Sequence, residues 1–453
     1  MKQYNQYLEY TKENLSWMGE IPKTWEIHKL DRLASLVTGN TPPKAQEENY
    51  KNGYVPWVKP DNILENHRIS ETKEKLSGVG VKKARLIPPY SALVCCIGSV
   101  GKVGINSVEC ATNQQINSII FDNEEWNNRY GLYCTIASEQ EYEKYSNKVV
   151  VGILNKQAQG KIKMPVPPLN EQRKIADFLD QKTSEVDDLI ADKERLIELL
   201  EEKRQAIITE AVTKGLDPDV KMKDSELTWL GMIPEKWSVK KIKHISTFIG
   251  SGKTPKGGSE VYSSDGVVFI RSMNVHNKGL KLDDVVYIDK KIDYDMKSTR
   301  VISNDILLNI TGASIGRSCI VPTGFPDANV NQHVCIIRPS KVQIYPSLLS
   351  KLMVSQTVKD QIDRSQNGSS REGLNFSQVG NIYFPISPDL EEQKNISNYI
   401  EEEINNIDRV IIDITRQIKK FEEYRQSLIY EAVTGKIDVR DYPLERKEEA
   451  HAD

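Results

Sequence analysis

Apolar residues recur with a helical spacing in two long stretches of the chain, residues 170–215 and 391–437. Their separations alternate between four and three residues, as at the a and d positions of a coiled coil, with polar interruptions in the first stretch. Neither stretch contains proline, and glycine occurs only at the ends, as Gly215 and Gly435. Each stretch is therefore predicted to form one helix of about 44 residues, roughly 65 Å long. The predicted seam consists of Leu179, Val186, Ile190, Ile197, Leu200 and Ile207 in the first helix and Ile400, Ile404, Ile407, Ile411, Ile414, Ile418, Phe421 and Leu428 in the second.

The sequence outside these helices has a different pattern. Short runs of β-branched and aromatic residues, such as WVKPDNI at 57–63 and ILLNITGASIG at 306–316, alternate with glycine turns and prolines. This pattern predicts α+β modules with a largely antiparallel or mixed sheet. The chain then divides into a first module at 1–169, a helix at 170–215, a second module at 216–390, a helix at 391–437 and a polar tail at 438–453.

The second half of the chain repeats the first. WMGEIPKTW at 17–25 returns as WLGMIPEKW at 229–237, and EQRKIADFLD at the start of the first helix returns as EQKNISNYIE 221 residues later. Insertions fall only between the matching blocks, which indicates two copies of one fold with different loops. The tryptophans and isoleucines of the repeated phrase are predicted to anchor the two cores; they are Trp17, Ile21, Trp25, Trp229, Ile233 and Trp237.

Two equivalent helices in one chain can bury their seams against each other. The simplest closed arrangement is pseudo-two-fold, with the two helices paired as an antiparallel coiled coil. The alternative is that each helix packs only on its own module. The sequence favours the paired arrangement, because a lone helix of this length would leave its apolar seam in water.

The composition predicts a cytoplasmic protein. Hydrophobic residues make up 38% of the 453 residues and charged residues 28%, and no apolar run is long enough to cross a membrane. The six cysteines form no CxxC pair and no metal-type cluster with histidine, so a reduced, disulfide-free chain is expected. Segments 1–169 and 215–390 carry net charges of +3 and +4, whereas 170–214 and 391–436 carry −4 and −3. Mildly basic modules suit contact with phosphates.

No motif in the sequence makes a convincing catalytic site. GSGKT at 250–254 resembles the end of a phosphate-binding loop, but Thr247 stands where that loop needs its first glycine. Asp61, Glu71 and Lys73 satisfy a permissive nuclease pattern whose carboxylates would hold Mg²⁺, and the second copy lacks it. A metal-dependent nuclease therefore stays open as an alternative, as does a coiled-coil scaffold without catalysis.

The two modules differ most in the polar residues of their loops, which suits two readers of different ligands. Amide side chains and arginine can read base edges of DNA, while lysine and serine suit phosphates. The candidate DNA-binding residues are Thr41, Lys44, Lys59, Asp61, Asn62, Asn113, Gln114 and Gln115 in the first module and Lys253, Thr254, Lys256, Arg271, Ser272, Asn274, Asn331, Gln332, His333, Ser369, Ser370 and Arg371 in the second.

On its repeated blocks, the chain resembles the specificity subunits of type I restriction–modification systems. The blocks are IPKTWE and IPEKWS at the module starts, GSVGKVG and GASIGR within the modules, PVPPLNEQRKIADFLDQKTSEVD and PISPDLEEQKNISNYIEEEINNID at the helix starts, and EAVTKG and EAVTGK at the helix ends. The resemblance extends from about residue 17 to residue 438. One departure is PISPDLEEQ, where Asp389 and one additional residue interrupt the usual PPL-x-EQ.

The resemblance implies a DNA-reading subunit with no catalysis of its own. Each module would be a target recognition domain for one half of a bipartite site in double-stranded DNA, and the paired helices would hold the two halves about one DNA turn apart. Two methyltransferase subunits, which use S-adenosylmethionine to methylate adenine, and two restriction subunits that act as motor and nuclease would join it. No cofactor, metal or membrane is expected for the chain itself.

Overall fold

The chain folds into two compact units. The computed structural model describes residues 4–11, 16–121, 124, 126–148, 152–366 and 373–443. Unit 1 comprises Met1–Lys193 and Arg416–Asp453, and unit 2 comprises Glu194–Thr415. Each unit therefore contains one module together with part of each long helix.

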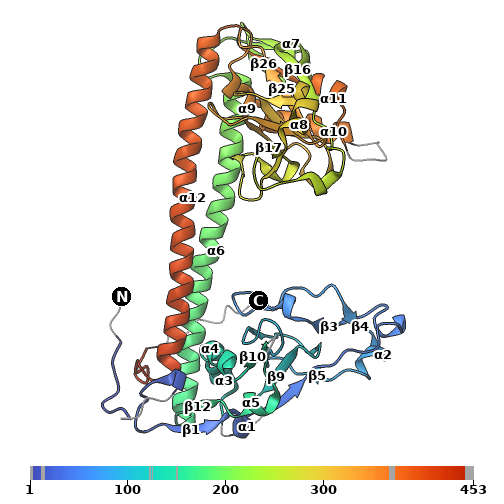
Figure 1. Ribbon diagram of the computed structural model, residues 1–453. Coiled ribbons are helices and arrows are strands. Elements are labelled where there is room, and N and C mark those ends of the chain that lie inside the picture. The colour runs from blue at the N-terminus through green and yellow to red at the C-terminus, as the bar shows by residue number, and fades with distance from the viewer. Residues whose placement is uncertain are drawn as a thin grey trace. The chain divides into compact units, whose positions relative to one another are not determined.

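The two long helices are α6 (Leu169–Lys214) and α12 (Leu390–Val433), of 46 and 44 residues. Every predicted seam residue is buried or half-buried. In unit 1, Leu179 of α6 shares a core with Val433 of α12, while Lys193 donates to Gln417 at 2.7 Å. The residue numbers of the contacts in α12 fall as those in α6 rise, so the two helix segments run antiparallel within this unit. Figure 1 shows α6 and α12 side by side.

The two modules have the same strand order. The four-stranded sheets are β2-β9-β6-β7 and β4-β3-β8-β5 in unit 1 and β16-β25-β22-β23 and β20-β17-β24-β21 in unit 2. Strands β3 and β8 run parallel, as do β17 and β24, and the other pairs in these sheets are antiparallel. The predicted α+β fold with two repeated modules is therefore confirmed, whereas the predicted pseudo-two-fold relation between them stays a prediction.

The corresponding elements follow one another in the same order. Unit 1 contains β1 (Glu26–Lys29), α1 (Leu30–Leu33), β2 (Ser35–Thr38), β3 (Val55–Val58), η3 (Pro60–Asn62), β4 (Lys75–Leu76), α2 (Gly78–Val81), β5 (Leu86–Ile87), β6 (Ala92–Cys95), β7 (Val103–Ile105), β8 (Cys110–Thr112), β9 (Ile116–Ile120), α3 (Asn128–Ala137), α4 (Glu139–Lys144), β10 (Asn147–Lys148), β11 (Gly152–Ile153), α5 (Lys156–Gly160) and β12 (Lys163–Val166). Unit 2 contains β13 (Met222–Asp224), β14 (Met232–Pro234), β15 (Ser238–Lys241), α7 (Ile242–Ile245), β16 (Ser246–Ser251), β17 (Val267–Ile270), η5 (Ser272–Asn274), β18 (Val275–His276), β19 (Gly279–Leu280), β20 (Val286–Ile288), α8 (Lys290–Asp295), β21 (Arg300–Val301), β22 (Ile306–Asn309), β23 (Ser318–Ile320), β24 (Ala328–Val330), β25 (Val334–Pro339), α9 (Pro346–Met353), α10 (Gln356–Gln366), α11 (Phe376–Gly380) and β26 (Tyr383–Ile386).

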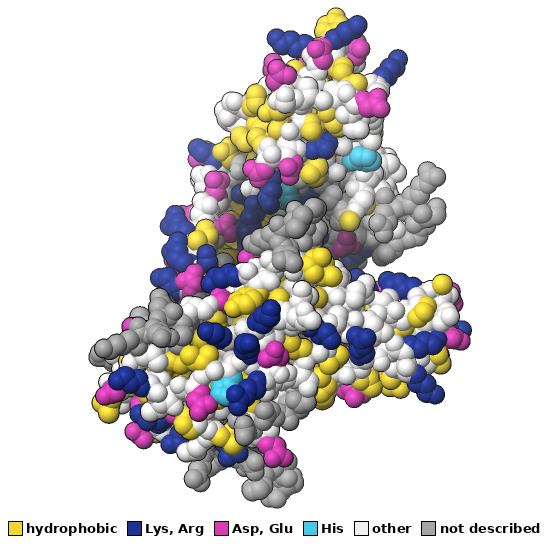
Figure 2. Space-filling view, turned by 60° about the horizontal axis from the view of Figure 1, so that its bottom comes forward, with side chains coloured by type: hydrophobic (Ala, Val, Ile, Leu, Met, Phe, Trp, Pro, Cys, Tyr) yellow, Lys and Arg dark blue, Asp and Glu magenta, His cyan; other side chains and the backbone are white. Residues whose placement is uncertain are grey.

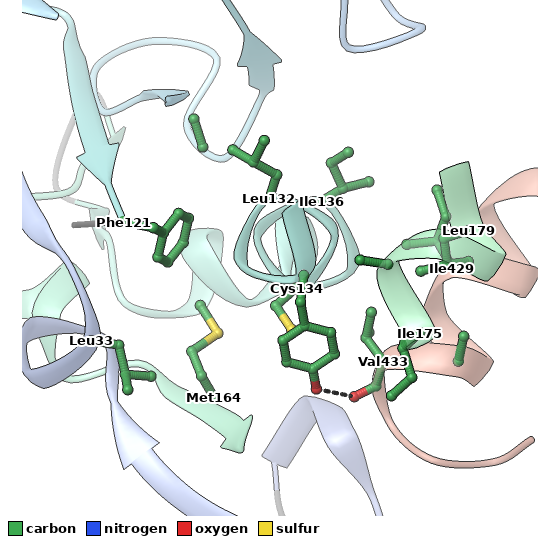
Figure 3. Close-up of a cluster of buried hydrophobic side chains, with 14 of the residues drawn as sticks. Leu33, Phe121, Leu132, Cys134, Ile136, Met164, Ile175, Leu179, Ile429 and Val433 are labelled. Carbon is green, nitrogen blue, oxygen red and sulfur yellow. Dashed lines mark hydrogen bonds between the residues drawn. The ribbon is translucent and has the colours of Figure 1, made fainter. Parts of the chain in front are cut away.

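The core of each unit is completed by the last turns of the helix that follows the other module. Figure 3 shows Ile175 and Leu179 of α6 beside Ile429 and Val433 of α12, with α3 and its Cys134 packed against them. Tyr130 of α3 donates its hydroxyl to the Val433 carbonyl at 3.2 Å. In unit 2 the end of α6 supplies Ile208, Ala211 and Val212, and the start of α12 supplies Ile396 and Ile400.

The repeated WxGxIPxxW phrase meets the start of a long helix in both units. Trp25 donates its indole N–H to Glu171 Oε1 at 3.0 Å, and Trp237 donates to Glu392 Oε1 at 3.1 Å. The Tyr7 hydroxyl also donates to Glu171, and burial together with this bond raises the pKa of Tyr7 well above its usual range. The glycine that ends the other long helix also lies beside each tryptophan, Gly435 beside Trp25 and Gly215 beside Trp237. Three repeated blocks therefore meet here: the WxGxIPxxW phrase, the start of one long helix and the end of the other.

Several predicted core positions are confirmed. Trp25, Ile21, Trp237 and Ile233 are buried, whereas Trp17 and Trp229 are only half-buried. The adjacent Cys95 and Cys96 are buried, and all six cysteines are buried free thiols. Burial raises the pKa of Cys95 to about 12 and that of Cys96 to about 11.

The beginning of the predicted polar tail packs on unit 1. Val439 is buried in its core, and the Tyr442 ring lies 4.8 Å from the Phe178 ring between centroids. Among the described residues, no helix has both the length and the apolar character needed to span a membrane.

Gly435 tests how tightly the helix end is fitted to the repeated phrase. Its φ is +69°, and a Cβ there would lie 2.4 Å from Pro22 Cδ and 3.1 Å from Trp25 Cη2. We expect Gly435→Ala to lower the free energy of unfolding by about 3 kcal/mol, from backbone strain plus overpacking. Gly231 has the same φ and no atom within 4 Å, so Gly231→Ala should cost about 1 kcal/mol. Calorimetric unfolding of both variants measures the difference. Equal losses of unfolding free energy would show that the close approach of Gly435 to Pro22 does not add to the cost of the substitution.

Candidate nucleic-acid interface

Three of the predicted loops meet at one edge of the second sheet in each module. The loops after β3 and β8 leave the same sheet edge because these strands run parallel, and the Asn113 amide donates to the Val58 carbonyl at 3.1 Å. In unit 2 the Asn331 amide donates to the Ile270 carbonyl at 3.0 Å in the same way. We call this edge, formed by residues 39–44, 59–62 and 113–115 or by residues 251–256, 271–274 and 331–333, the reading edge.

The loop that contains Thr-Pro lies directly on this edge. The Asn40 amide donates to the Thr112 carbonyl at 2.9 Å, and the Thr41 hydroxyl donates to Gln114 Oε1 at 2.6 Å. In unit 2 the approach is even closer, since a Cβ on Gly252 would fall 1.5 Å from the Val330 carbonyl oxygen. Thr41 and Gln114, predicted from separate motifs, are therefore brought together.

Two of the predicted readers instead hold a turn in place. Asn62 accepts from the Lys59 amide at 3.0 Å, and Asn274 accepts from the Arg271 amide at the same distance, so each closes a 3-10 turn. Asn274 is 2% exposed and donates its amide group to the Lys281 carbonyl at 2.9 Å. The Asn274 side chain is thus buried and hydrogen-bonded within the protein, where it supports the turn.

The amide-rich loops after β8 and β24 also contain both buried and exposed amide side chains. Asn113 donates to Gln115 Oε1 at 2.8 Å and accepts from the Gln115 amide, while Asn331 accepts from the His333 amide at 3.1 Å. Asn113 and Asn331 are buried, whereas Gln114 and Gln332 are exposed. Gln114 and Gln332 are therefore the most exposed amide side chains of these two loops.

In module 1 the reading edge carries two lysines around one tryptophan and one carboxylate. Lys59 Nζ lies 4.6 Å and Lys44 Nζ 5.5 Å from the Trp57 ring centroid. Glu74 contacts Lys59 at 2.7 Å and Lys44 at 3.8 Å, and the bond from Lys59 lowers the pKa of Glu74. The carboxylate therefore partly neutralises both lysines.

Module 2 presents an arginine at the same place, and no acidic side chain pairs with it among the described residues. Arg271 lies 5.9 Å from the Tyr262 ring and donates Nη2 to the Asp284 carbonyl at 2.6 Å. Strand pairing places Val286 opposite Phe269, as Glu74 lies opposite Trp57 in module 1. The Nε of Arg271 is buried without a hydrogen-bond partner among the described residues. The two reading edges thus share a backbone and differ in charge.

Glu74 is not among the residues predicted from the sequence to contact DNA. It stands between Lys73 and Lys75 in a polar segment, where nothing in the sequence separates it from a surface residue. The repeat offset of 212 residues pairs Glu74 with Val286, so the change from acid to valine at a strand position was the available signal.

The other predicted residues have varied positions. Lys253, Thr254, Lys256 and Asp61 are exposed, and His333 shares a bond of 2.5 Å with the Thr311 hydroxyl. The Ser272 carbonyl accepts from Asn309 at 2.8 Å. Ser369, Ser370 and Arg371 lie outside the described residues.

The nuclease alternative finds no geometric support. Glu71 lies 3.7 Å from Lys75 in an exposed ion pair. In the part of the chain that the structure describes, no group of three or more His, Cys, Asp or Glu side chains could hold a metal. Figure 2 shows basic and acidic side chains interspersed over the face it draws, so contacts at particular loops would have to supply any preference for phosphates.

A protein-family comparison matches both halves of the chain. The model for the type I restriction modification DNA specificity domain matches residues 22–199 and again residues 234–420. The two matches together cover most of the chain and coincide with the two copies of the repeat.

Individual proteins are similar over almost the full length. The specificity subunit of the type I restriction enzyme EcoBI from Escherichia coli is 26% identical over 439 residues, covering 95% of this chain and 90% of that protein. The MjaVIII specificity subunit of Methanocaldococcus jannaschii is 25% identical over 445 residues, covering 95% and 98%. A chain from a structural study of complex assembly and conformational transition in the type I R-M system is similar in fold, with a TM-score of 0.63, 12% identity and coverage of 91% and 98%.

Glu74→Gln should strengthen binding to duplex DNA of unrelated sequence. Removing the carboxylate frees Lys44 and Lys59 for phosphates, so log K should fall more steeply with log salt, by about one to two in slope. Glu71→Gln removes the same charge from an 89% exposed side chain in the same segment and should change the slope much less. Fluorescence anisotropy over a salt series measures both, and equal slopes would mean that the two lysines do not contact phosphate.

Proposed function

Because the chain belongs to the family of type I restriction modification DNA specificity proteins, we propose that each of its two modules reads one half of a bipartite target in double-stranded DNA. It is a specificity subunit, whose role in the restriction–modification complex is recognition rather than catalysis. The observation that supports the division of the target is the pair of reading edges. They have the same backbone design and carry different side chains at corresponding positions.

The side chains suggest how each edge would contact DNA. Arg271 and Gln332 are suited to hydrogen-bond base edges, Arg to guanine and Gln to adenine, whereas the lysines of the Thr-Pro loops suit phosphates. In module 1, the Glu74 carboxylate could accept a hydrogen bond from a cytosine amino group when Lys59 moves to a phosphate. A carboxylate in one edge and an arginine in the other would give the half-sites different sequences.

The long helices would set the distance between the half-sites. Each is a continuous helix of 46 or 44 residues with proline-free sequence. A helix of this length is long enough to hold two reading edges about one DNA turn apart. In this proposal the acidic outer faces of the helices stay away from DNA and are available to protein subunits.

Specificity subunits of this family assemble with methyltransferase and restriction subunits and with DNA. We propose two copies of each partner around one copy of this chain, in the cytoplasm. S-adenosylmethionine would bind the methyltransferase subunits, which would methylate adenine after base flipping. This chain would position the target adenines and would take no part in methyl transfer.

Methylated-adenine mapping in cells that co-express the chain with its methyltransferase tests the proposal. We expect one two-part motif, with Arg271→Ala relaxing a position in one half and Glu74→Gln relaxing a position in the other half. Loss of a bidentate base contact should reduce discrimination at that position by about tenfold or more. Each variant serves as the control for the other, and a substitution that altered both half-sites would contradict the assignment of one module to each.

A further inference from the structure

A carboxylate on α6 joins three separate segments of unit 1. Asp187 accepts from Arg425 Nη1 of α12 at 2.5 Å and from Arg68 Nη2 at 3.1 Å. Arg68 belongs to the loop that follows η3 at the reading edge, and this loop is closed by the Ser70 amide donating to the Asn62 carbonyl at 2.8 Å. The Asp187 side chain therefore contacts both the neighbouring helix α12 and the loop that follows η3 in module 1. We call this loop, and the β18–β19 hairpin that follows η5 in module 2, the reading loops.

Unit 2 contains the same arrangement with the helices exchanged. Asp408 of α12 contacts Arg204 Nη2 of α6 at 2.6 Å and Lys278 Nζ at 3.3 Å. Lys278 lies in the hairpin between β18 and β19 that follows η5 at the second reading edge. A second acid, Glu201, lies 3.7 Å from Lys278.

The repeat shows that the two networks are equivalent. An offset of 221 residues converts Asp187 to Asp408 and Arg204 to Arg425. Each aspartate nevertheless pairs with the arginine of the other copy, because the paired helix segments run antiparallel. The residue numbers of both pairs add to the same value, so both bonds specify a single register between α6 and α12.

The two cations of each network differ in how far they are exposed to solvent. The side chains of Arg425 and Arg204 are 10% and 12% exposed, whereas those of Arg68 and Lys278 are 68% and 64% exposed. A sheltered ion pair is costly to break because it leaves an unpaired charge, and such pairs can fix register between helices. An exposed ion pair adds little stability, and here it joins the loop to the helix pair.

We propose that Asp187 and Asp408 are positioning residues for target reading. Each fixes the register of the helix pair and at the same time holds the reading loop of its module against that pair. The two aspartates thereby set the number of base pairs that the protein accepts between the half-sites. This inference rests on the proposed function for its DNA readout and on the networks alone for its structural part.

The structural part is tested on the full-length chain by hydrogen–deuterium exchange. Asp187→Asn should speed exchange at the amides of Leu64 and Ser70 by roughly threefold, the equivalent of a loss of about 0.6 kcal/mol in local stability. Asp188→Asn is the matched control, because Asp188 is the exposed neighbour on the same helix and the charge change is identical. Unchanged exchange in Asp187→Asn, or the same change in Asp188→Asn, would overturn the proposal.

The functional part uses the complex with the methyltransferase subunit and duplexes whose half-sites are separated by the natural gap or by one base pair more or fewer. Wild type should methylate the natural gap preferentially. Asp187→Asn and Asp408→Asn should reduce this preference by roughly tenfold while keeping the half-site sequences unchanged. Arg68→Ala, which leaves the helix pair intact, should reduce it less.

A charge-exchange variant distinguishes loss of the ion pair from misfolding of the variant. Asp187→Arg combined with Arg425→Asp restores the inter-helix pair but not the contact with Arg68, so it should recover only the part of the gap preference that depends on helix register. A wild-type complex that reads two half-sites, together with Asp187→Asn and Asp408→Asn variants that keep its gap preference, would overturn the positioning role and leave the proposed function intact. Failure of the wild-type complex to read two half-sites would contradict the proposed function, and the exchange experiment would still decide the structural part.

Discussion

The fold depends on the fact that neither module can bury its core without the helix that follows the other module. The last turns of α12 supply Ile429 and Val433 to unit 1, and the last turns of α6 supply Ile208 and Val212 to unit 2. Burying two such side chains in each unit contributes on the order of 3–6 kcal/mol per unit, a large share of the 5–15 kcal/mol stability of a typical domain. Both long helices must therefore be in place before either module is complete.

The same constraint explains why the repeated phrases stand where they do. Trp25 and Glu171 mark where a helix leaves its module, and Gly435 marks where the other helix arrives. A buried carboxylate next to Trp25 is stable only while its hydrogen-bond donors remain, so the site tolerates little change. The three motifs are distant in sequence and close in space.

Much of this architecture could be predicted from the sequence. The apolar spacing gave the helices and their seam, and the repeat implied two equal modules. What the sequence could not show was which copy supplies each partner. Asp187 has two equivalent arginines available by alignment, Arg204 and Arg425, and only the antiparallel arrangement within the units selects Arg425.

The reading edges were harder to predict, for a reason that lies in the chemistry of amides. Asn274 and Gln332 look equally suited to DNA in the sequence, yet one is 2% exposed and closes a turn while the other is exposed. Asparagine favours turns because its short side chain reaches its own backbone, and that competes with any external ligand. Glu74 shows the opposite case, in which a residue of ordinary appearance gains importance from the two lysines beside it.

Under the proposed function, stability and recognition are carried by different parts of each module. The helix ends, the buried tryptophans and the turn-closing asparagines form a frame that is nearly the same in both copies. The exposed loop residues, such as Lys253 and Gln332, can change with little effect on folding, since substitutions away from buried contacts usually alter stability by less than about 0.5 kcal/mol. If the loops read DNA as proposed, such a protein can acquire a new target sequence through them while the helices continue to fix the register, and the two properties can then vary independently.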